Sequence, residues 1–447
     1  MNAPFWLKLK EKCPPFWRKL AKNAGTALCG TTGAAFLDYL SLALTIRCLG
    51  VLDYGFFVLA QQYMIIIDNL ANFQSWSAVI KFGSDALVAN DEKRLLATIK
   101  SGYLVDIGTA VLGTILAIAL VPLVGHLLGW SSELEFAALV FSLTIVSHIE
   151  GSSVGVLRLF DKFKWTAYQA VGSSLFKLGL LCVYVFALHA PGGYLGFACA
   201  YVAADVVKHT SLLLISLVYV RKRFGLVRVL TAPLNYVDKG FFKFCLWSNL
   251  GTSVDVPVKY LDVYIVELVS VEMVGIYKAY RQILQLFVTL TNPISVALMP
   301  QVAELVSRGE ERRGYHVVCK IRNLAFMVLL PFFILAALFG SPVLNFLLGP
   351  GFGDNIHLFL ALFALSIISI SYVGLHPFFL ALGKAREDSL ISLVSNVFYL
   401  GVVFVLISLI GVWAVVVATA IQYAITIVAK LVIVHKVLRD GEVNGEI

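Results

Sequence analysis

The sequence predicts an all-α polytopic membrane protein with 12 transmembrane helices, arranged as two six-helix bundles that are related by a parallel pseudo-two-fold repeat. Three observations lead to this fold class. Apolar residues make up 59% of the 447 positions and charged residues 14%, and the mean hydropathy is +0.86. Apolar stretches of about 20 residues recur along the chain, and cationic loops alternate with loops that hold almost no cation. We expect a chain of this composition to be surrounded by lipid.

The positive charges indicate an orientation in the bilayer. Of the 35 Lys and Arg residues, 29 fall in alternate segments, which face the cytoplasm by the positive-inside rule. These segments are 8–22, 81–100, 158–164, 221–243, 308–322, 384–386 and the tail from 430. Both termini are then cytoplasmic. The net charge of +8 matches the anionic headgroups of the inner surface, so nucleic-acid binding is not expected.

Twelve candidate spans follow one another along the chain. The first six lie near 24–46, 56–79, 102–124, 136–156, 165–188 and 195–220. The last six lie near 244–266, 276–299, 325–339, 356–382, 391–409 and 412–434. The predicted plan is a basic cytoplasmic segment 1–22, an N-terminal bundle 23–220, a cytoplasmic linker 221–242, a C-terminal bundle 243–435 and a cytoplasmic tail 436–447.

A weak internal repeat supports this plan. A shift of 220 positions aligns Gly55 with Gly275 and Gln62 with Gln282, with each pair at the same place in its hairpin. Six spans in each half orient both copies the same way, as in parallel repeats that are related by an axis along the membrane normal. We therefore expect a binding site between the two bundles.

Charged side chains inside the spans are where function is expected, because each costs about 2.5–3.5 kcal/mol at a helix centre. The cations within or beside apolar stretches are candidate substrate-binding residues: Arg47, Lys177, Lys208, Lys259, Lys278 and Arg281. Four interior carboxylates are candidates for ion coupling: Asp38, Asp68, Asp255 and Asp262.

Several of these charges also have a structural interpretation. Lys259 lies one turn from Asp255, and Lys208 lies about one turn from Asp205, so both pairs could simply neutralise themselves and join helices. Three other cations have no acid within one turn of their own helix, and for at least two of them a ligand-facing role is favoured: Lys177, Lys278 and Arg281.

Two further charges have competing interpretations. Arg47 ends the first span just before Asp53, and it fits a structural clamp as well as a ligand contact. Asp68 could carry a proton or bind sodium, but a hydrogen-bonded interior carboxylate is the favoured interpretation.

Motifs of catalysis are largely missing from the sequence. It has no nucleotide P-loop, no HExxH and no GxSxG, so we expect no enzyme, cofactor or metal site. His148 and Glu150 form an H-x-E that is too short to identify a site. The 7 cysteines are an odd number without CxxC spacing, which favours neither disulfides nor zinc.

Three segments carry a family resemblance. They run from Arg47 to Gly55, from Phe73 to Gly83, and from Leu261 to Arg281, where the last ends in Gly-Ile-Tyr-Lys-Ala-Tyr-Arg. They resemble the bacterial polysaccharide-biosynthesis transporters, the O-antigen flippase type within the multidrug/oligosaccharidyl-lipid/polysaccharide exporter superfamily.

The resemblance implies a V-shaped pair of bundles around a central cavity, in the bacterial cytoplasmic (inner) membrane. The implied substrate is an oligosaccharide on undecaprenyl diphosphate, moved to the outer leaflet at the expense of an ion gradient. Membrane lipids and the glycan polymerase machinery are the implied partners. The cationic cavity role of the family carries over only to Arg47, Lys278 and Arg281, which lie at signature positions.

Fixed cations would help a diphosphate across the bilayer, because opposite charges about 4 Å apart attract by roughly 4 kcal/mol at an effective dielectric of 20. The main alternative is a drug or metabolite antiporter of the same fold, in which Asp38, Asp68 and Asp255 bind a cation. A membrane glycan polymerase, ligase or acyltransferase is less favoured, because such enzymes need a large outer loop or a clear catalytic His. A scaffold without transport activity is a further alternative.

Overall fold

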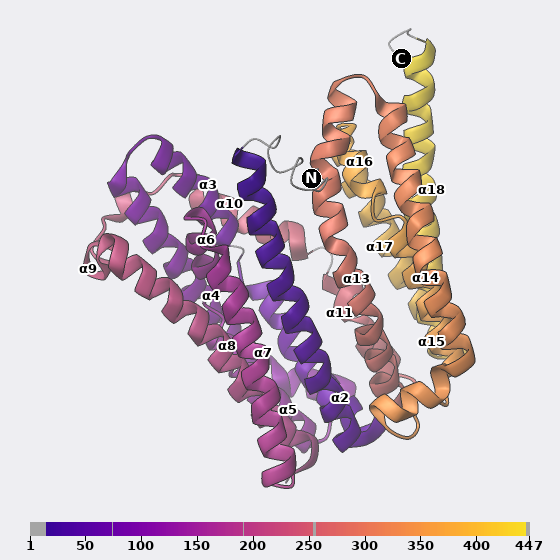
Figure 1. The fold of residues 1–447 in the computed structure, drawn as a ribbon. Coiled ribbons are helices and arrows are strands. Elements are labelled where there is room, and N and C mark those ends of the chain that lie inside the picture. Colours follow the sequence, from indigo (N-terminus) through magenta and orange to yellow (C-terminus); the bar gives the residue numbers. More distant parts are fainter. Residues whose placement is uncertain (1–14, 74, 191, 254–255, 444–447) are drawn as a thin grey trace, which may run out of the picture. The chain divides into compact units, whose positions relative to one another are not determined.

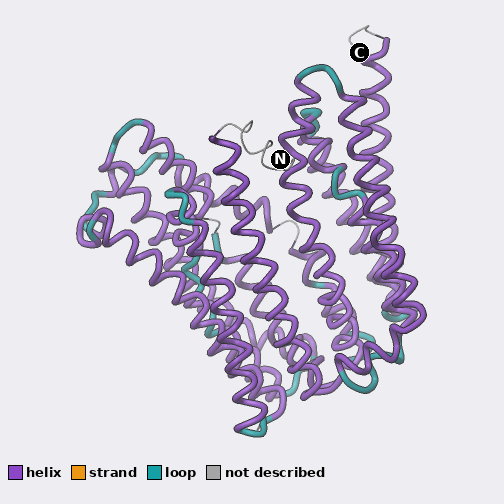
Figure 2. The backbone as a smooth tube through the Cα atoms, viewed as in Figure 1, coloured by secondary structure: helices purple, strands orange, loops and turns teal. Residues whose placement is uncertain are grey.

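The computed structural model describes residues 15–73, 75–190, 192–253 and 256–443, and the regular elements in these ranges are all helical (Figure 1). Short loops join the helices (Figure 2). Within the described part of the chain, nine helices are long and apolar enough to cross a membrane. Large apolar side chains such as Met327 and Leu338 are exposed on their surfaces, as expected of helices that face lipid.

Contacts divide the chain into two compact units. Unit 1 consists of Met1–Leu42 and Tyr63–Ser253, and unit 2 consists of Ala43–Gln62 and Val254–Ile447. The chain therefore contributes a short N-terminal insert, residues 43–62, to the unit that holds its C-terminal half. The bundle boundaries expected from the sequence remain a prediction.

The helix α2 (Pro15–Ala71) runs through both units and contains the turn predicted between the first two spans. Its helical path is broken at Gly50, whose φ of 72° and ψ of −173° lie where side chains are rarely tolerated. The predicted basic segment 1–22 is described only from Pro15, where α2 begins.

Unit 1 also contains α3 to α10. Their bounds are α3 (Ser75–Val88), α4 (Glu92–Leu128), α5 (Ser132–Ser142), η1 (Ile145–Ser147), α6 (Gly151–Leu159), α7 (Phe163–Cys182), η2 (Val183–Ala187), α8 (Gly193–Phe224), α9 (Leu226–Leu230), η3 (Leu234–Tyr236) and α10 (Phe241–Ser253). Helix α3 packs on α4 and α6, and α7 packs on α8. Asp91 caps α4 by accepting a hydrogen bond from the amide of Arg94 at 3.0 Å.

Unit 2 contains the remaining helices. Their bounds are α11 (Val256–Tyr260), α12 (Asp262–Glu267), α13 (Val271–Ser307), α14 (Glu311–Leu348), α15 (Ile356–Ser371), α16 (Leu375–Ala381), α17 (Ala385–Ile410) and α18 (Trp413–Val443). Helix α17 packs along α18, α14 packs on α15, and α13 contacts α15 and α16. The predicted tail 436–447 is described to Val443, and α18 continues through that part.

Several predicted spans are interrupted in the structure: 56–79 between α2 and α3, 136–156 among α5, η1 and α6, and 356–382 between α15 and α16. The seventh is the one that bears on the site. Residues 244–266 were expected to form one helix, but they are divided among the short helices α10, α11 and α12. Pro257 lies in the first turn of α11, where its missing N–H is tolerated, and it cannot continue a helix arriving from α10. The break places Asp262 at the first turn of α12.

Candidate functional site

A cavity of about 260 Å³ in unit 2 brings polar side chains together from α11, α12, α13, α15, α17 and α18. Its charged lining consists of Lys259, Asp262 and Arg281. Beside five apolar side chains, amides and hydroxyls also line it: Tyr277, Gln285, Ser366, Ser369, Tyr399, Thr419, Gln422 and Tyr423. The lining therefore holds two cations and one carboxylate among neutral hydrogen-bonding groups, so its formal charge is positive.

Asp262 is held in the cavity wall by several partners. Its side chain is fully buried and receives hydrogen bonds from the Tyr277 hydroxyl at 2.6 Å and from the amide of Val263 at 2.9 Å. Arg281 forms an ion pair with the same carboxylate and also donates to the Tyr277 hydroxyl at 3.2 Å. The Arg281 side chain is 40% exposed. The bonds of Arg281 to Asp262 and to Tyr277 both use its Nη1 atom, so the other N–H groups of the guanidinium can donate to a ligand in the cavity.

Lys278 lies one turn before Arg281 on α13 and has a neutral partner. Its Nζ donates to the Gln62 Oε1 atom at 2.7 Å, and the side chain is half-buried. A second hydrogen bond joins the insert 43–62 to α13, because the Tyr54 hydroxyl donates to the Gln282 Oε1 atom at 2.9 Å. Lys278 therefore does not line the cavity beside Arg281, although the sequence places the two cations only three residues apart.

The other predicted residues of unit 2 are dispersed. Arg47 is exposed, and its guanidinium lies over the Phe346 ring at 5.8 Å from the centroid, which places it at the end of α14. Lys259 lines the cavity of Asp262. Asp255 lies outside the described residues.

Unit 1 holds the remaining predicted charges. The Lys177 ammonium donates to Asp38 at 2.9 Å, and it lies over the Tyr201 ring at 4.9 Å from the centroid. Ser174 donates to the second oxygen of Asp38 at 3.2 Å. Lys208 is exposed on α8. The structure therefore groups Asp38 with Lys177, and it brings neither of them to the cavity of unit 2.

Asp68, a predicted ion-coupling candidate, belongs to a polar cluster in unit 1. It contacts His148, and the H-x-E segment that was too short to identify a site contributes both His148 and Glu150 to the cluster. The fourth member is His209, which no motif singled out. The signal available in the sequence was a histidine in each of the fourth and sixth predicted spans. In the described part of the chain, no group of three or more His, Cys, Asp or Glu side chains has metal-binding geometry.

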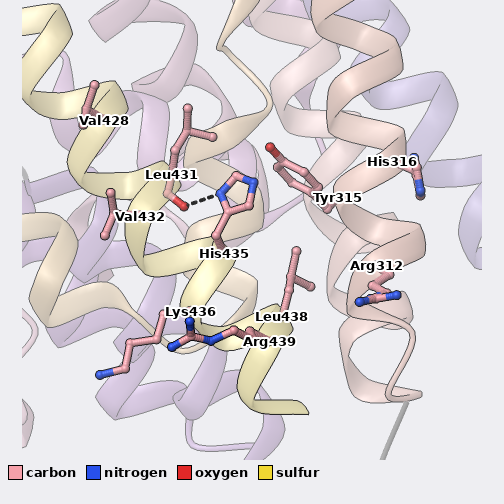
Figure 3. Close-up of a pocket in the computed structure, with 10 residues that line it drawn as sticks. All are labelled: Arg312, Tyr315, His316, Val428, Leu431, Val432, His435, Lys436, Leu438 and Arg439. Carbon is pink, nitrogen blue, oxygen red and sulfur yellow. Dashed lines mark hydrogen bonds between the residues drawn. The ribbon is translucent and has the colours of Figure 1, made fainter. Parts of the chain in front are cut away.

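A larger cavity of about 870 Å³ lies in unit 2, between α14 and α18. Its basic lining residues come from both helices: Arg312, His316, His435, Lys436 and Arg439. Figure 3 shows His435 bonded through its ring nitrogen to the Leu431 carbonyl oxygen, a distance of 2.7 Å. All five residues belong to segments that the positive-inside rule assigns to the cytoplasmic surface. Cations at that surface meet anionic headgroups, so we favour the cavity of Asp262 as the candidate transport site.

Comparisons with known proteins agree with the sequence resemblance. A family model described as polysaccharide biosynthesis protein matches residues 20–306. The inner membrane protein YghQ of Escherichia coli (strain K12) is 25% identical over 153 residues, which are 34% of this chain and 43% of that protein. This match therefore spans less than half the length of the curated relative.

Solved structures show the fold. An inward-facing multidrug resistance MATE family transporter of the MOP superfamily aligns with a TM-score of 0.71 at 15% identity, over 94% of this chain and 95% of that one. A MOP superfamily transporter from Pyrococcus furiosus, described as having a binding pocket of reverse polarity, aligns with a TM-score of 0.63 at 13% identity, over 93% of this chain and 95% of that one. The chain is a multi-pass membrane protein of this fold.

Proposed function

We propose that this chain, which belongs to the polysaccharide biosynthesis protein family, is a flippase for a polyprenyl-diphosphate-linked oligosaccharide. It moves the lipid-linked glycan from the cytoplasmic to the outer leaflet of the bacterial inner membrane, with both termini in the cytoplasm. It works without catalysis and draws on an ion gradient. Membrane lipids surround it, and the glycan polymerase machinery receives its product.

The observation that carries this proposal is the charge of the cavity in unit 2. Lys259 and Arg281 line the cavity together with one carboxylate, Asp262, so its described lining holds more cations than anions. Because Asp262 and Tyr277 hold one edge of the guanidinium, Arg281 is oriented before a ligand arrives, which lowers the entropy cost of binding. Guanidinium groups match phosphate oxygens in bidentate geometry.

The size of the cavity also fits a headgroup. At about 260 Å³ it is smaller than the roughly 300–1,000 Å³ of sites that enclose drug-sized ligands. A diphosphate with its first sugar fits such a volume, and neutral hydroxyls and amides suit the sugar. The polyprenyl chain stays in the lipid, because apolar tails gain nothing from a polar cavity.

The proposal includes 12 spans in two bundles of six. The insert 43–62 supports the repeat, because it packs in unit 2 against the segment that the 220-position shift aligns with it. The inner-membrane location follows the description of the Escherichia coli relative. The orientation follows the cation distribution.

The runner-up is a cation-coupled drug or metabolite antiporter. The fold shared with a multidrug resistance transporter and the buried carboxylate of Asp262 favour it. The Pyrococcus furiosus neighbour, whose pocket polarity was taken to suggest a different function, supports assigning substrate class by pocket charge. Two cations against one carboxylate favour an anionic substrate here.

Reconstitution tests the choice between these functions. Liposomes containing the protein receive a polyprenyl-diphosphate oligosaccharide in one leaflet, and a membrane-impermeant lectin reports its arrival in the other. We expect wild-type protein to equilibrate the glycan lipid and R281A to be slow. Transport of a lipophilic cation by the same liposomes, with the glycan lipid left in its starting leaflet, would establish the antiporter instead.

A further inference from the structure

Two histidines lie face to face in the interior of unit 1. The rings of His148 and His209 have centroids 4.0 Å apart and an interplanar angle of 36°. Each residue is only 6% exposed. They come from different elements, because His148 lies in the break between η1 and α6, whereas His209 lies within α8. Such close contact of two titratable rings inside a membrane protein requires a reason.

Each ring has its own carboxylate. The Nδ1 atom of His148 lies 2.9 Å from Asp68 of α2, and the Nδ1 atom of His209 lies 3.0 Å from Glu150, the residue before α6. At His148 the carboxylate on Nδ1 holds the proton there and leaves Nε2 as the basic nitrogen, whereas Nδ1 of His209 is near Glu150 without a hydrogen bond to it. The Nε2 atom of His148 is buried and has no hydrogen-bond partner. The cluster thus contains a buried base that is free to accept a proton.

Other charges surround the cluster. On α8, Asp205 acts electrostatically on His148 and Lys208 acts on His209, and Glu150 acts on Asp106 of α4. Asp106 in turn accepts hydrogen bonds from Ser75 of α3 and from the amide of Ser152 in α6, the latter at 2.5 Å. The carboxylates attract the first proton to the ring pair. The charge of the first imidazolium then opposes a second one at 4.0 Å.

The cluster lies where several helical elements of unit 1 contact one another, so a change in its charge acts on those contacts. His148 also accepts a hydrogen bond through its backbone carbonyl from Asn72 at 3.3 Å, just after α2. Asp68, His148, Glu150 and His209 therefore tie α2, the break before α6, and α8 to one another. The described residues of this cluster do not form a metal site. A proton is a cation that this pair of neighbouring imidazoles can bind, because the Nε2 atom of His148 has no hydrogen-bond partner.

We propose that the His148–His209 pair is a proton-binding site that couples the proton gradient to transport. The inference rests on the proposed transport function and names its coupling ion and residues. The neutral Nε2 of His148 accepts a proton from one side of the membrane and releases it to the other, and His209 shares the charge. Asp68 and Glu150 are positioning residues that orient the rings.

Direct titration tests the site without any transport assay. The full chain in lipid nanodiscs carries ¹⁵N-labelled histidine, and the ring nitrogens are followed by NMR between about pH 5 and pH 8. We expect His148 and His209 to titrate as a coupled pair, and H209Q to shift the titration of His148. Rings that keep one protonation state throughout, or a His148 titration that H209Q leaves unchanged, would overturn the proposal.

Transport then tests the coupling. In liposomes, an imposed proton gradient is expected to accelerate wild-type glycan-lipid transport, and H148Q and H209Q are expected to lose this acceleration while keeping gradient-independent exchange. The matched control is H126Q, which changes an exposed histidine of the same unit and should behave as wild type. If H148Q fails to fold, H209Q and D68N make the same test.

The outcomes separate the two proposals. Variants that fold and still respond fully to the gradient would show that the pair does not couple transport. Wild-type protein that moves no glycan lipid, but whose histidines titrate as a pair, would refute the proposed substrate and leave the proton site standing.

Discussion

Gly55 and Gly275 lie against one another in unit 2, and each faces the backbone of the other's helix. A Cβ atom added at Gly55 would overlap the carbonyl oxygen of Val271, and one added at Gly275 would overlap the carbonyl oxygen of Val51. The same 220-position shift that aligns the two glycines also aligns Val51 with Val271. The contact is therefore reciprocal between positions that the 220-position shift aligns.

The first prediction concerns this close approach. G55A and G275A should each lower the free energy of unfolding by about 1–3 kcal/mol, because a backbone atom cannot move aside as a flexible side chain can. The measurement is the thermal unfolding midpoint in detergent. The matched control is G401A on α17, where no atom lies within 4 Å of the added Cβ. A G55A midpoint equal to that of G401A would contradict the packing.

The second prediction concerns the buried ion pair. R281A leaves the Asp262 carboxylate with only neutral donors, so it should destabilise the protein toward the lower end of the roughly 3–5 kcal/mol seen for broken buried pairs. The lower value is expected because the Arg281 side chain is 40% exposed, so water already screens the ion pair in part. D262N/R281M should regain stability, and it should still fail to transport. The double-mutant cycle measures the stabilities, and the liposome assay measures transport.

A second ion pair of the same unit provides the control for this test. Lys430 and Asp388 lie 2.5 Å apart, and their side chains are 8% and 13% exposed. D388N/K430M should leave transport intact, because neither residue lines the cavity of Asp262. R281K should keep part of the transport, since an ammonium preserves the charge but not the planar fork of donors. Normal transport by D262N/R281M would show that the pair is structural only.

The third prediction concerns Lys278. K278A should abolish surface glycan, because Lys278 is a cation at a signature position of the family resemblance and its partner, Gln62, leaves that charge uncompensated. The amount of protein in the membrane should stay nearly normal, because the substitution leaves a neutral amide without its partner and not a buried carboxylate. Blots of surface polysaccharide and of membrane fractions in a deletion strain measure both. Q62A is the matched control: it removes the hydrogen bond and keeps the cation, so export should persist. Normal export by K278A would remove this residue from the mechanism.

The fourth prediction concerns orientation. Cys48 is exposed and follows the first span, on the side predicted to face outward, whereas Cys319 lies in a segment predicted to be cytoplasmic. In spheroplasts, a membrane-impermeant maleimide should label a variant that keeps only Cys48. A variant that keeps only Cys319 should react with the maleimide only after the membrane has been permeabilised. Cys245 is buried and should resist labelling in both cases. The reverse labelling pattern would show that the predicted topology is inverted.

Long apolar stretches were predictable because their signal is local. Each of α14, α17 and α18 contains one expected span, since some 20 apolar residues favour a membrane helix wherever they occur. The broken segment 244–266 was not predicted as three helices. Pro257 was visible in the sequence, but whether a proline kinks, ends or opens a helix depends on the neighbours that can satisfy the freed backbone groups.

The candidate site was predictable only in part. The sequence singled out Arg281 and Asp262 as separate candidates, and it placed Asp262 in the same predicted span, 244–266, as Lys259. The structure instead connects Asp262 to Arg281 and Tyr277 on the next helix. No periodicity along one helix reports a partner on another, so such pairs could not be assigned from spacing alone.

Composition and the order of charges by themselves determined that this is a membrane protein, which loops are basic and roughly where long spans such as those of α14, α17 and α18 lie, because transfer to lipid depends on each segment's own residues. Tertiary structure alone decided that residues 43–62 pack with the C-terminal unit, that Asp262 holds Arg281, and that His148 lies against His209. Those contacts join residues far apart in the chain. Their energies depend on distance and burial, which exist only once the helices have packed.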